Sequence, residues 1–341
     1  MLWTSHHIVL DGWSMPIVVR DVLTAYAAQR EHRTPWPGRP AARYADYIAW
    51  LQSQDATKAE AFWRRALDGF QTPSLVAGSH AAGQAAASPA QPHQVLVLRT
   101  QLPATLVEAL QQLGAGQHIT MNTWCAGAWA LLLARFTRQR DVAFGTVVSG
   151  RPADLPDAGT IAGLFINTLP LRLKVLPGTP AVSWFADCQR RQVEAREYEY
   201  SSLARIQSWS AVPAGTPLFD SLFVYENYPV EQAWREQTEL RVEQASASVQ
   251  TNFPLAIEVA GRGSELGITV AVDSARVSPT LAGFVRDGFE VVLSRVLATP
   301  DITVGALLDA LDESTTGDTS TLRSGRRASL QSLRRTANRS S

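Results

Sequence analysis

Two adjacent histidines near the start of the chain, His6 and His7, are followed by Asp11 and Gly12. The unperturbed pKa of histidine lies near neutrality, so an imidazole that faces a reacting amine or alcohol can accept and return a proton. The carboxylate of Asp11 can orient the loop or pair with a cation, and Gly12 can take backbone angles that other residues avoid. This run therefore predicts a site for acid and base chemistry with one of the two histidines as the candidate base.

Two other readings compete with this interpretation. A metal site would need an unbroken helix between His7 and Asp11 and normally a third ligand. Gly12 and Pro16 instead favour a strand end that enters a loop, and no other histidine is spaced as a ligand. We expect no metal, whereas a buried structural histidine pair stays open on spacing alone.

The elements that must position this loop can be read from the flanking pattern. Residues 2–5 read as a strand end, and Ser14 is a candidate N-cap for a helix that runs to about Gln29. A loop between two packed elements is a common place for catalytic residues. The segment 35–40 is a rigid proline-rich connector, and helical stripes resume near 44–51 and 58–67.

Further along, strands and helices alternate, which predicts an α/β fold. Strands are expected over 94–98, 141–148, 166–175, 221–225, 255–260 and 266–272, and helices over 103–113, 120–135, 180–197 and 280–296. Residues 76–92 are rich in Ala, Gly, Ser, Gln and Pro, which predicts a flexible surface connector between two lobes. We therefore divide the chain into an N-terminal lobe portion (1–75), the connector (76–92), a C-terminal lobe (93–312) and a disordered basic linker (313–341).

Composition restricts the class of protein. Lys+Arg and Asp+Glu both total 31, so no global field favours nucleic acid or an anionic membrane. Cys125 and Cys188 lie inside apolar helical patterns and are expected to be buried, inert thiols. Neither an apolar run of membrane-spanning length nor a signal peptide is found, so we expect a cytoplasmic protein.

The segment from Gly163 to Arg172 carries two residues of interest. Gly163 permits close backbone approach, and Asn167 offers a donor and an acceptor within an otherwise apolar strand. From the residues alone, Asn167 is as consistent with a turn or register role as with a role in a site.

The run from His6 to Gly12 resembles the HHxxxDG signature of the condensation domains of nonribosomal peptide synthetases, which are acyltransferases of the chloramphenicol acetyltransferase-like superfamily. Five further segments resemble later motifs of that family in the family's order: 43–50, 149–152, 163–172, 219–229 and 251–255. The resemblance implies a two-layer α+β fold of that superfamily. It also implies a complete C-terminal lobe and only part of the N-terminal lobe, because the family has a substantial stretch before the histidine pair.

The resemblance further implies an enzyme that forms a peptide bond between a carrier-bound acyl or peptidyl thioester and a carrier-bound aminoacyl thioester. The substrates would be carried on the phosphopantetheine arms of carrier protein domains upstream and downstream. An adenylation domain would follow in the chain, and the domain itself would bind no cofactor directly. The implied catalytic residues are His7, His6, Asp11 and Gly12, with Gly12 N–H and Asn167 donating to an oxyanion. The implied substrate or tunnel residues are Trp13, Ser14, Gly163 and Asn167.

One departure from the family leads to a specific expectation. The arginine that would pair with Asp11 belongs to the stretch before His6, so Asp11 is expected to lack its counter-charge, and the chain by itself is expected to be inactive. A truncated remnant that binds carrier proteins, and a related ester-forming or epimerising domain, remain alternatives.

Overall fold

The computed structural model describes residues 6, 8–34, 42–77, 95–226 and 251–313. His7, the predicted strand at 2–5, the connector at 35–40 and the basic linker beyond residue 313 lie outside this set. The predicted connector at 76–92 also lies outside it, apart from Val76 and Ala77.

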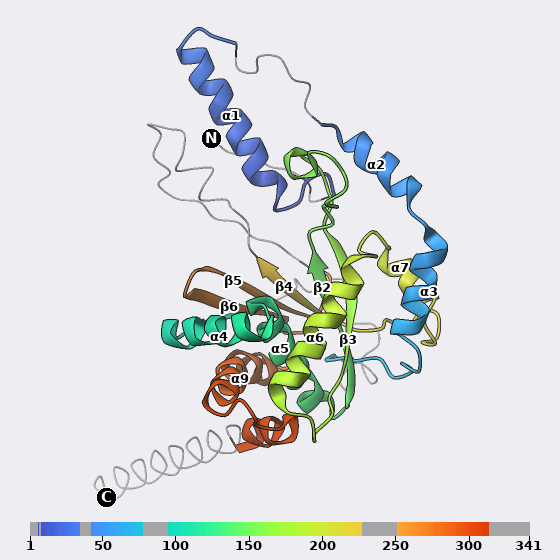
Figure 1. The fold of residues 1–341 in the computed structure, drawn as a ribbon, viewed down its shortest axis with the longest axis vertical. Helices are drawn as coiled ribbons and strands as arrows, with labels where there is room; N and C mark the ends of the chain where they lie inside the picture. The colour runs from blue at the N-terminus through green and yellow to red at the C-terminus, as the bar shows by residue number, and fades with distance from the viewer. Residues whose placement is uncertain (1–5, 7, 35–41, 78–94, 227–250, 314–341) are drawn as a thin grey trace, which may run out of the picture.

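A mixed six-stranded sheet forms the centre of the molecule (Figure 1). Its strands are β1 (Val95–Leu102), β2 (Asp141–Val148), β3 (Asn167–Lys174), β4 (Ser221–Glu226), β5 (Leu255–Arg262) and β6 (Glu265–Asp273), in the order β1-β6-β5-β4-β2-β3. The β2–β4 and β4–β5 pairs are parallel, and the other pairs are antiparallel. Every predicted strand in the described residues is present, with end shifts of a few residues.

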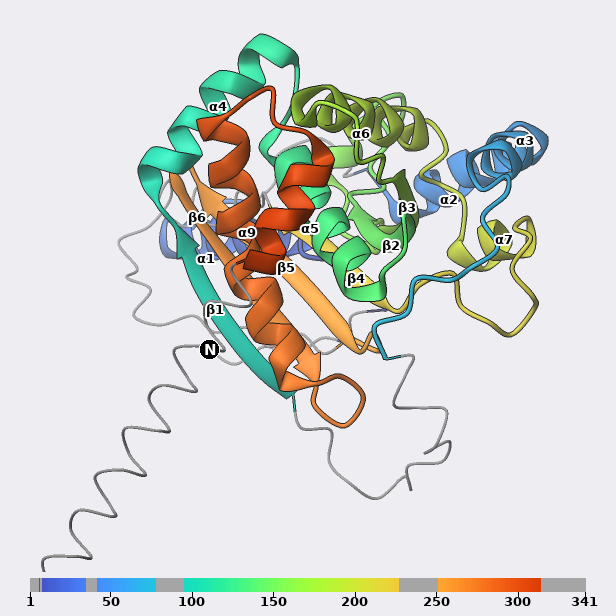
Figure 2. The same cartoon turned by 90° about the horizontal axis from the view of Figure 1, so that it is seen from below.

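One face of the sheet is covered by a helical layer, which Figure 2 shows from below. The layer contains α4 (Ala104–Gln117), α5 (Met121–Thr137), α6 (Ala181–Arg196) and α9 (Pro279–Ala298), and residues 304–313 form a final helix. Helix α5 is apolar almost all round, and a helix of that kind must be buried. It accordingly packs between α9 and β2 in the main core. The predicted α/β architecture is confirmed.

Both cysteines belong to this main core. Cys125 and Cys188 are fully buried, and burial raises the pKa of Cys125 to about 12 and that of Cys188 well above its usual value. A thiol with such a pKa stays protonated and unreactive at neutral pH, as the sequence predicted.

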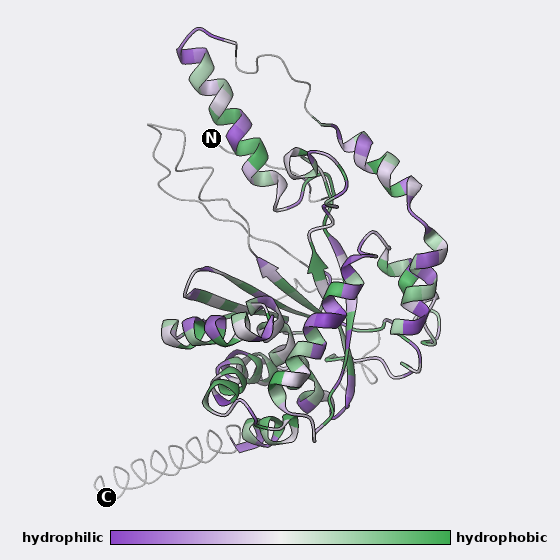
Figure 3. Ribbon diagram, in the orientation of Figure 1, coloured by the Kyte–Doolittle hydropathy of each residue, from purple (hydrophilic) through white to green (hydrophobic). Residues whose placement is uncertain are grey.

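A second core forms on the opposite face of β2 and β3. Helix α3 (Ala56–Ala66) and helix α7 (Leu203–Ser208) pack there through Phe62, Trp63 and Ile206, and Phe219 from the segment before β4 joins them. Figure 3 shows α3 and α6 with alternating hydrophilic and hydrophobic segments, as expected for helices that cover a core with one side only. The chain from α3 onward therefore packs on the same sheet as the segment beyond residue 95.

The start of the predicted connector behaves differently from the expectation. Val76 and Ala77 are buried, and their backbone N–H groups donate to the two carboxylate oxygens of Asp220 at 2.7 and 2.9 Å. The prediction of a flexible surface segment that begins at residue 76 was wrong for these two residues, because a buried carboxylate fixes their backbone.

Two helices lie beyond the end of the sheet, α1 (Ser14–Arg30) and α2 (Tyr44–Ser53) (Figure 1). The segment 149–166, which leads from β2 to β3, rises toward them. The predicted helix to about Gln29 is confirmed, and so is the helical stripe at 44–51. These two helices and the 149–166 segment surround the residues that follow the histidine pair.

Candidate functional site

Asp11 is the centre of a buried hydrogen-bond network. Its side chain is only 1% exposed, and its Oδ1 accepts from the Ser14 N–H at 2.8 Å. Its Oδ2 accepts from the backbone N–H groups of Phe165 at 2.9 Å and Ile166 at 3.4 Å. A buried carboxylate needs several donors of this kind to offset its lost hydration. Asp11 therefore holds the start of α1 against the residues just before β3.

Arg151 supplies the counter-charge of Asp11. Its Nη2 lies 3.3 Å from Asp11 Oδ1, and its Nη1 donates to the carbonyl oxygens of Ala158 at 2.5 Å and Ile161 at 2.8 Å. The guanidinium also lies over the Phe165 ring, 4.1 Å from its centroid. The expectation that Asp11 would lack a counter-charge was wrong, because an arginine 140 positions along the chain takes that place. The sequence contained a signal for it in the motif at 149–152, whose arginine was not assigned a role.

Ser14 joins the same network in a role other than the predicted one. The N-cap of α1 is Trp13, and Ser14 is the first helical residue. The Ser14 hydroxyl lies 2.7 Å from both Asp11 Oδ1 and the Gly163 carbonyl oxygen, either of which can accept its proton, and the Gly163 N–H donates to it at 3.0 Å. The prediction of Ser14 as N-cap was wrong because its side chain bridges two loops instead.

Gly163 makes the close approach that its residue type predicted. A Cβ atom built on Gly163 would lie 2.2 Å from the ring of Tyr44. The Tyr44 hydroxyl donates to the Leu164 carbonyl oxygen at 2.6 Å, so the ring cannot easily move aside. The absence of a side chain at this position is what lets α2 pack against the loop that holds Asp11.

The histidine pair is described only in part. His6 is exposed, and its Nδ1 accepts from the Ile8 N–H at 3.1 Å, which tightens the turn that follows. His7 lies outside the described residues, so its role as a base stays a prediction. The oxyanion role of the Gly12 N–H likewise stays a prediction.

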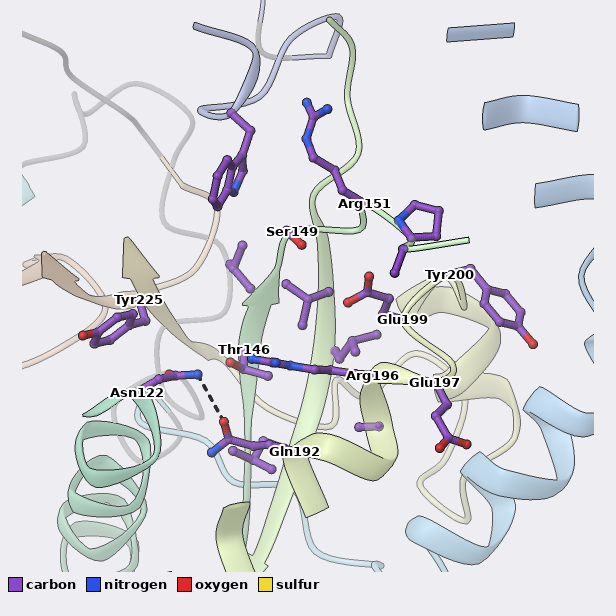
Figure 4. Close-up of a pocket in the computed structure, with 18 of the residues that line it drawn as sticks. Asn122, Thr146, Ser149, Arg151, Gln192, Arg196, Glu197, Glu199, Tyr200 and Tyr225 are labelled. Atoms are coloured by element: carbon purple, nitrogen blue, oxygen red, sulfur yellow. Dashed lines mark hydrogen bonds between the residues drawn. The ribbon is translucent and has the colours of Figure 1, made fainter. Parts of the chain in front are cut away.

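A cavity of about 830 Å³ opens beside this network (Figure 4). It lies over the end of β2 and the middle of β3, between the start of α5 and the end of α6. Trp13 and Arg151 both line it, and the substrate role of Trp13 stays a prediction. Residues of these elements, of α2, of β4 and of the adjoining loops also line it, among them Trp50, Gln54, Asn122, Thr146, Ser149, Leu169, Gln192, Arg196, Glu197, Glu199, Tyr200 and Tyr225.

Asn167 has a structural task in place of the predicted one. Its Nδ2 donates to the carbonyl oxygens of Glu199 at 2.8 Å and Ser201 at 2.7 Å, and its Oδ1 accepts from the Thr168 N–H at 2.8 Å. Both amide protons are thereby used, so neither is left for an oxyanion. The structure contradicts the oxyanion role of Asn167, which instead fixes the loop after α6.

Aromatic rings seal the side of the network that faces α2. The rings of Tyr47 and Phe165 lie 4.2 Å apart between centroids, and those of Tyr44 and Phe165 lie 5.4 Å apart. Burial, with smaller contributions from nearby charges, raises the pKa of Tyr47 to about 12. The Asp11 and Arg151 charges are therefore shielded from water on that side, which strengthens their interaction.

Metal-binding clusters and membrane-spanning helices are missing from the described residues. Among these residues, no group of three or more His, Cys, Asp or Glu side chains could hold a metal ion. No described helix combines the length and the apolar character that crossing a membrane requires.

Comparison with known proteins identifies the family of this chain. The Condensation domain family model matches residues 1–315, and the chain therefore belongs to that family. The X-domain from teicoplanin biosynthesis has the same fold, with a TM-score of 0.71, 23% identity and coverage of 88% of this chain and 69% of that chain. The first condensation domain of the calcium-dependent antibiotic synthetase superposes with a TM-score of 0.64 at 19% identity, covering 88% of this chain and 64% of that chain.

The similar curated proteins are peptide synthetases. The chain is 44% identical over 263 residues to chondramide synthase cmdD of Chondromyces crocatus, covering 76% of this chain. It is 38% identical over 307 residues to one of the linear gramicidin synthase subunits of Brevibacillus parabrevis, covering 90% of this chain. In each case it spans 6% of the relative's length.

Proposed function

We propose that this chain forms the amide bond between an acyl or peptidyl thioester donor and an aminoacyl thioester acceptor, each carried on the phosphopantetheine arm of a carrier protein domain. Carrier domains would deliver the two substrates from either side, and an adenylation domain would follow in the same synthetase. The domain itself would bind no metal and no soluble cofactor.

The observation that carries this proposal is the position of the Asp11 network beside the cavity. Asp11, Ser14 and Arg151 lock the loop that follows the histidine pair onto the residues that precede β3. Trp13 and Arg151 of the same network line the cavity. A loop held this firmly next to a cavity suits a reaction in which two tethered reactants must be aligned.

In the proposed chemistry, His7 positions the acceptor amine and takes part in its proton transfer, while the Gly12 N–H stabilises the oxyanion of the tetrahedral intermediate. An α-amino group has a reference pKa of about 7.7–8.0, so a sizeable part of it is already deprotonated near pH 7.5. Alignment of the two thioesters can therefore contribute more than base catalysis, up to about 7–11 kcal/mol of barrier reduction.

The test is a peptide-bond assay with donor-loaded and acceptor-loaded carrier proteins, read by mass spectrometry of the product. We expect His7→Ala to lower the rate by about 10²-fold, at the low end of the range for general acid and base catalysis. His32→Asn is the matched control, because His32 is exposed with a φ of 53° that asparagine tolerates.

Equal rates for the parent and His7→Ala would contradict the catalytic assignment of His7. No product from the parent, together with retained binding of carrier proteins, would favour a carrier-binding module that does not catalyse.

A further inference from the structure

Glu199 presents its carboxylate to the cavity. It follows the end of α6, and its side chain lines the cavity wall (Figure 4). Within the described part of the chain, this carboxylate takes part in no hydrogen bond and no ion pair. The hydrogen bonds of Glu199 are all made by its backbone, whose N–H donates to the Arg196 carbonyl oxygen at 3.3 Å.

The backbone of Glu199 is held by a residue adjacent to one that holds Asp11. Asn167 donates to the Glu199 carbonyl oxygen, and the residue directly before it, Ile166, donates its N–H to Asp11. Two consecutive residues at the start of β3 therefore fix both the loop of Asp11 and the loop of Glu199. A carboxylate that extends into a cavity from a backbone fixed in this way is suited to bind a particular group.

The negative charge of the Glu199 carboxylate is only partly compensated by its surroundings. Burial raises the pKa of Glu199, and the positive charge of Arg196 offsets this only in part. Figure 4 shows that Arg196 reaches across the cavity toward Thr146 and Asn122, while the carboxylate of Glu199 lies on another side of it. The two charges form no ion pair among the described residues. A partly buried carboxylate in this state is stabilised by any cation that enters the cavity.

We propose that Glu199 binds the protonated amino group of the acceptor substrate and is the first group to receive its proton. This inference rests on the proposed function, because it takes the acceptor to be an amine. The ammonium ion gives one proton to the carboxylate, which leaves a neutral amine and a carboxylic acid. The amine lone pair then attacks the donor thioester carbon and the C–N bond forms, which gives the tetrahedral intermediate. This intermediate collapses with cleavage of the C–S bond, a second proton of the amine neutralises the leaving thiolate, and Glu199 releases its proton to water.

Two features favour this ligand over an anionic or neutral one. The free carboxylate would repel an anion, and a neutral group would leave it uncompensated when water is displaced. The raised pKa of Glu199 also brings its proton affinity closer to that of an amine, so the proton passes to it more readily than to an exposed glutamate.

The test compares two probes that differ only at the amine: glycyl-pantetheine amide, with a free amino group, and its N-acetyl derivative. Binding of each to the full chain is measured by isothermal titration calorimetry at pH 7. A charged hydrogen bond at a partly exposed site predicts that the parent binds the free amine about tenfold more tightly. Glu199→Gln keeps the shape of the side chain and should remove this preference.

Glu197→Gln is the matched control. Glu197 lies two residues away and also lines the cavity, but it is exposed, and Figure 4 shows its carboxylate directed away from Glu199. We expect this variant to keep the preference of the parent, and far-ultraviolet circular dichroism should show that both variants fold.

The inference is overturned if the parent shows no preference for the free amine, if Glu199→Gln retains it, or if Glu197→Gln loses it equally. These outcomes are separate from failure of the proposed function. A parent that forms no peptide bond but prefers the free amine through Glu199 would refute the condensation activity alone. A parent and a Glu199→Gln variant with equal condensation rates would refute the role of Glu199 alone.

Discussion

Replacing Arg151 with methionine removes the cation at the centre of the network. The carbonyl oxygens of Ala158 and Ile161 lose their charged donor, and Asp11 loses its counter-charge. Each buried acceptor left without a partner costs about 1–3 kcal/mol, and removal of one member of a buried ion pair costs about 3–5 kcal/mol. Because Asp11 keeps its backbone donors, we expect a loss of about 3–5 kcal/mol for the whole change.

The matched control is Arg190→Met on α6. Arg190 is paired with Asp187 and Glu194, but its side chain is 56% exposed. Exposed ion pairs of this kind contribute about 0–1 kcal/mol. Arg151→Lys should fall between the two variants, since lysine keeps the charge but lacks the planar fork that reaches several acceptors.

The free energy of unfolding is measured by urea denaturation, with hydrogen exchange of the Ser14 and Phe165 amides as a local readout. Arg151→Met should lower the stability and speed the exchange of both amides, while Arg190→Met should leave the exchange unchanged. A loss of about 1 kcal/mol or less for Arg151→Met, equal to that of the control, would refute the assignment of Arg151 as the residue that holds this loop.

Three further changes test other parts of the structure. Gly163→Ala forces a Cβ atom against the Tyr44 ring and should cost about 1–3 kcal/mol, whereas Gly159→Ala, which meets nothing within 4 Å, should be neutral in the same urea titration. Asn167→Ala leaves the carbonyl oxygens of Glu199 and Ser201 without their donor and should lower the free energy of unfolding by about 1–3 kcal/mol. A melting temperature equal to that of the parent would argue against a role of Asn167 in holding this loop. Burial and the nearby Glu258 carboxylate raise the pKa of Glu226 to about 7, above its unfolded value of about 4.3. The folded state therefore binds the extra proton between these pH values, and stability from this group is lost as the pH rises through 7. Glu226→Gln should reduce this decline by about 1–2 kcal/mol between pH 5 and 8, a figure reduced for partial exposure, and an unchanged pH profile would contradict the assignment.

The sequence by itself determined the elements and the family. Local periodicity is a property of neighbouring residues, so the alternation along β6 and the apolar α5 could be read directly from their spacing. The motif that begins at His6 predicted Asp11 as a site residue. The ends of some elements differ from the predicted ends by a few residues. At the start of α1, for example, the Ser14 side chain bonds to the Gly163 carbonyl oxygen of a distant loop and does not cap the helix.

Only the tertiary structure decided which groups meet. Arg151 pairs with Asp11 across 140 positions, and Asn167 bonds to carbonyl groups more than 30 positions away. No periodicity records such partners, because hydrogen-bond choice depends on where packing brings each donor and acceptor. For the same reason the sequence assigned an oxyanion role to Asn167 and overlooked Glu199, whose carboxylate can be recognised as a cavity residue without a partner among the described residues only once the cavity is formed.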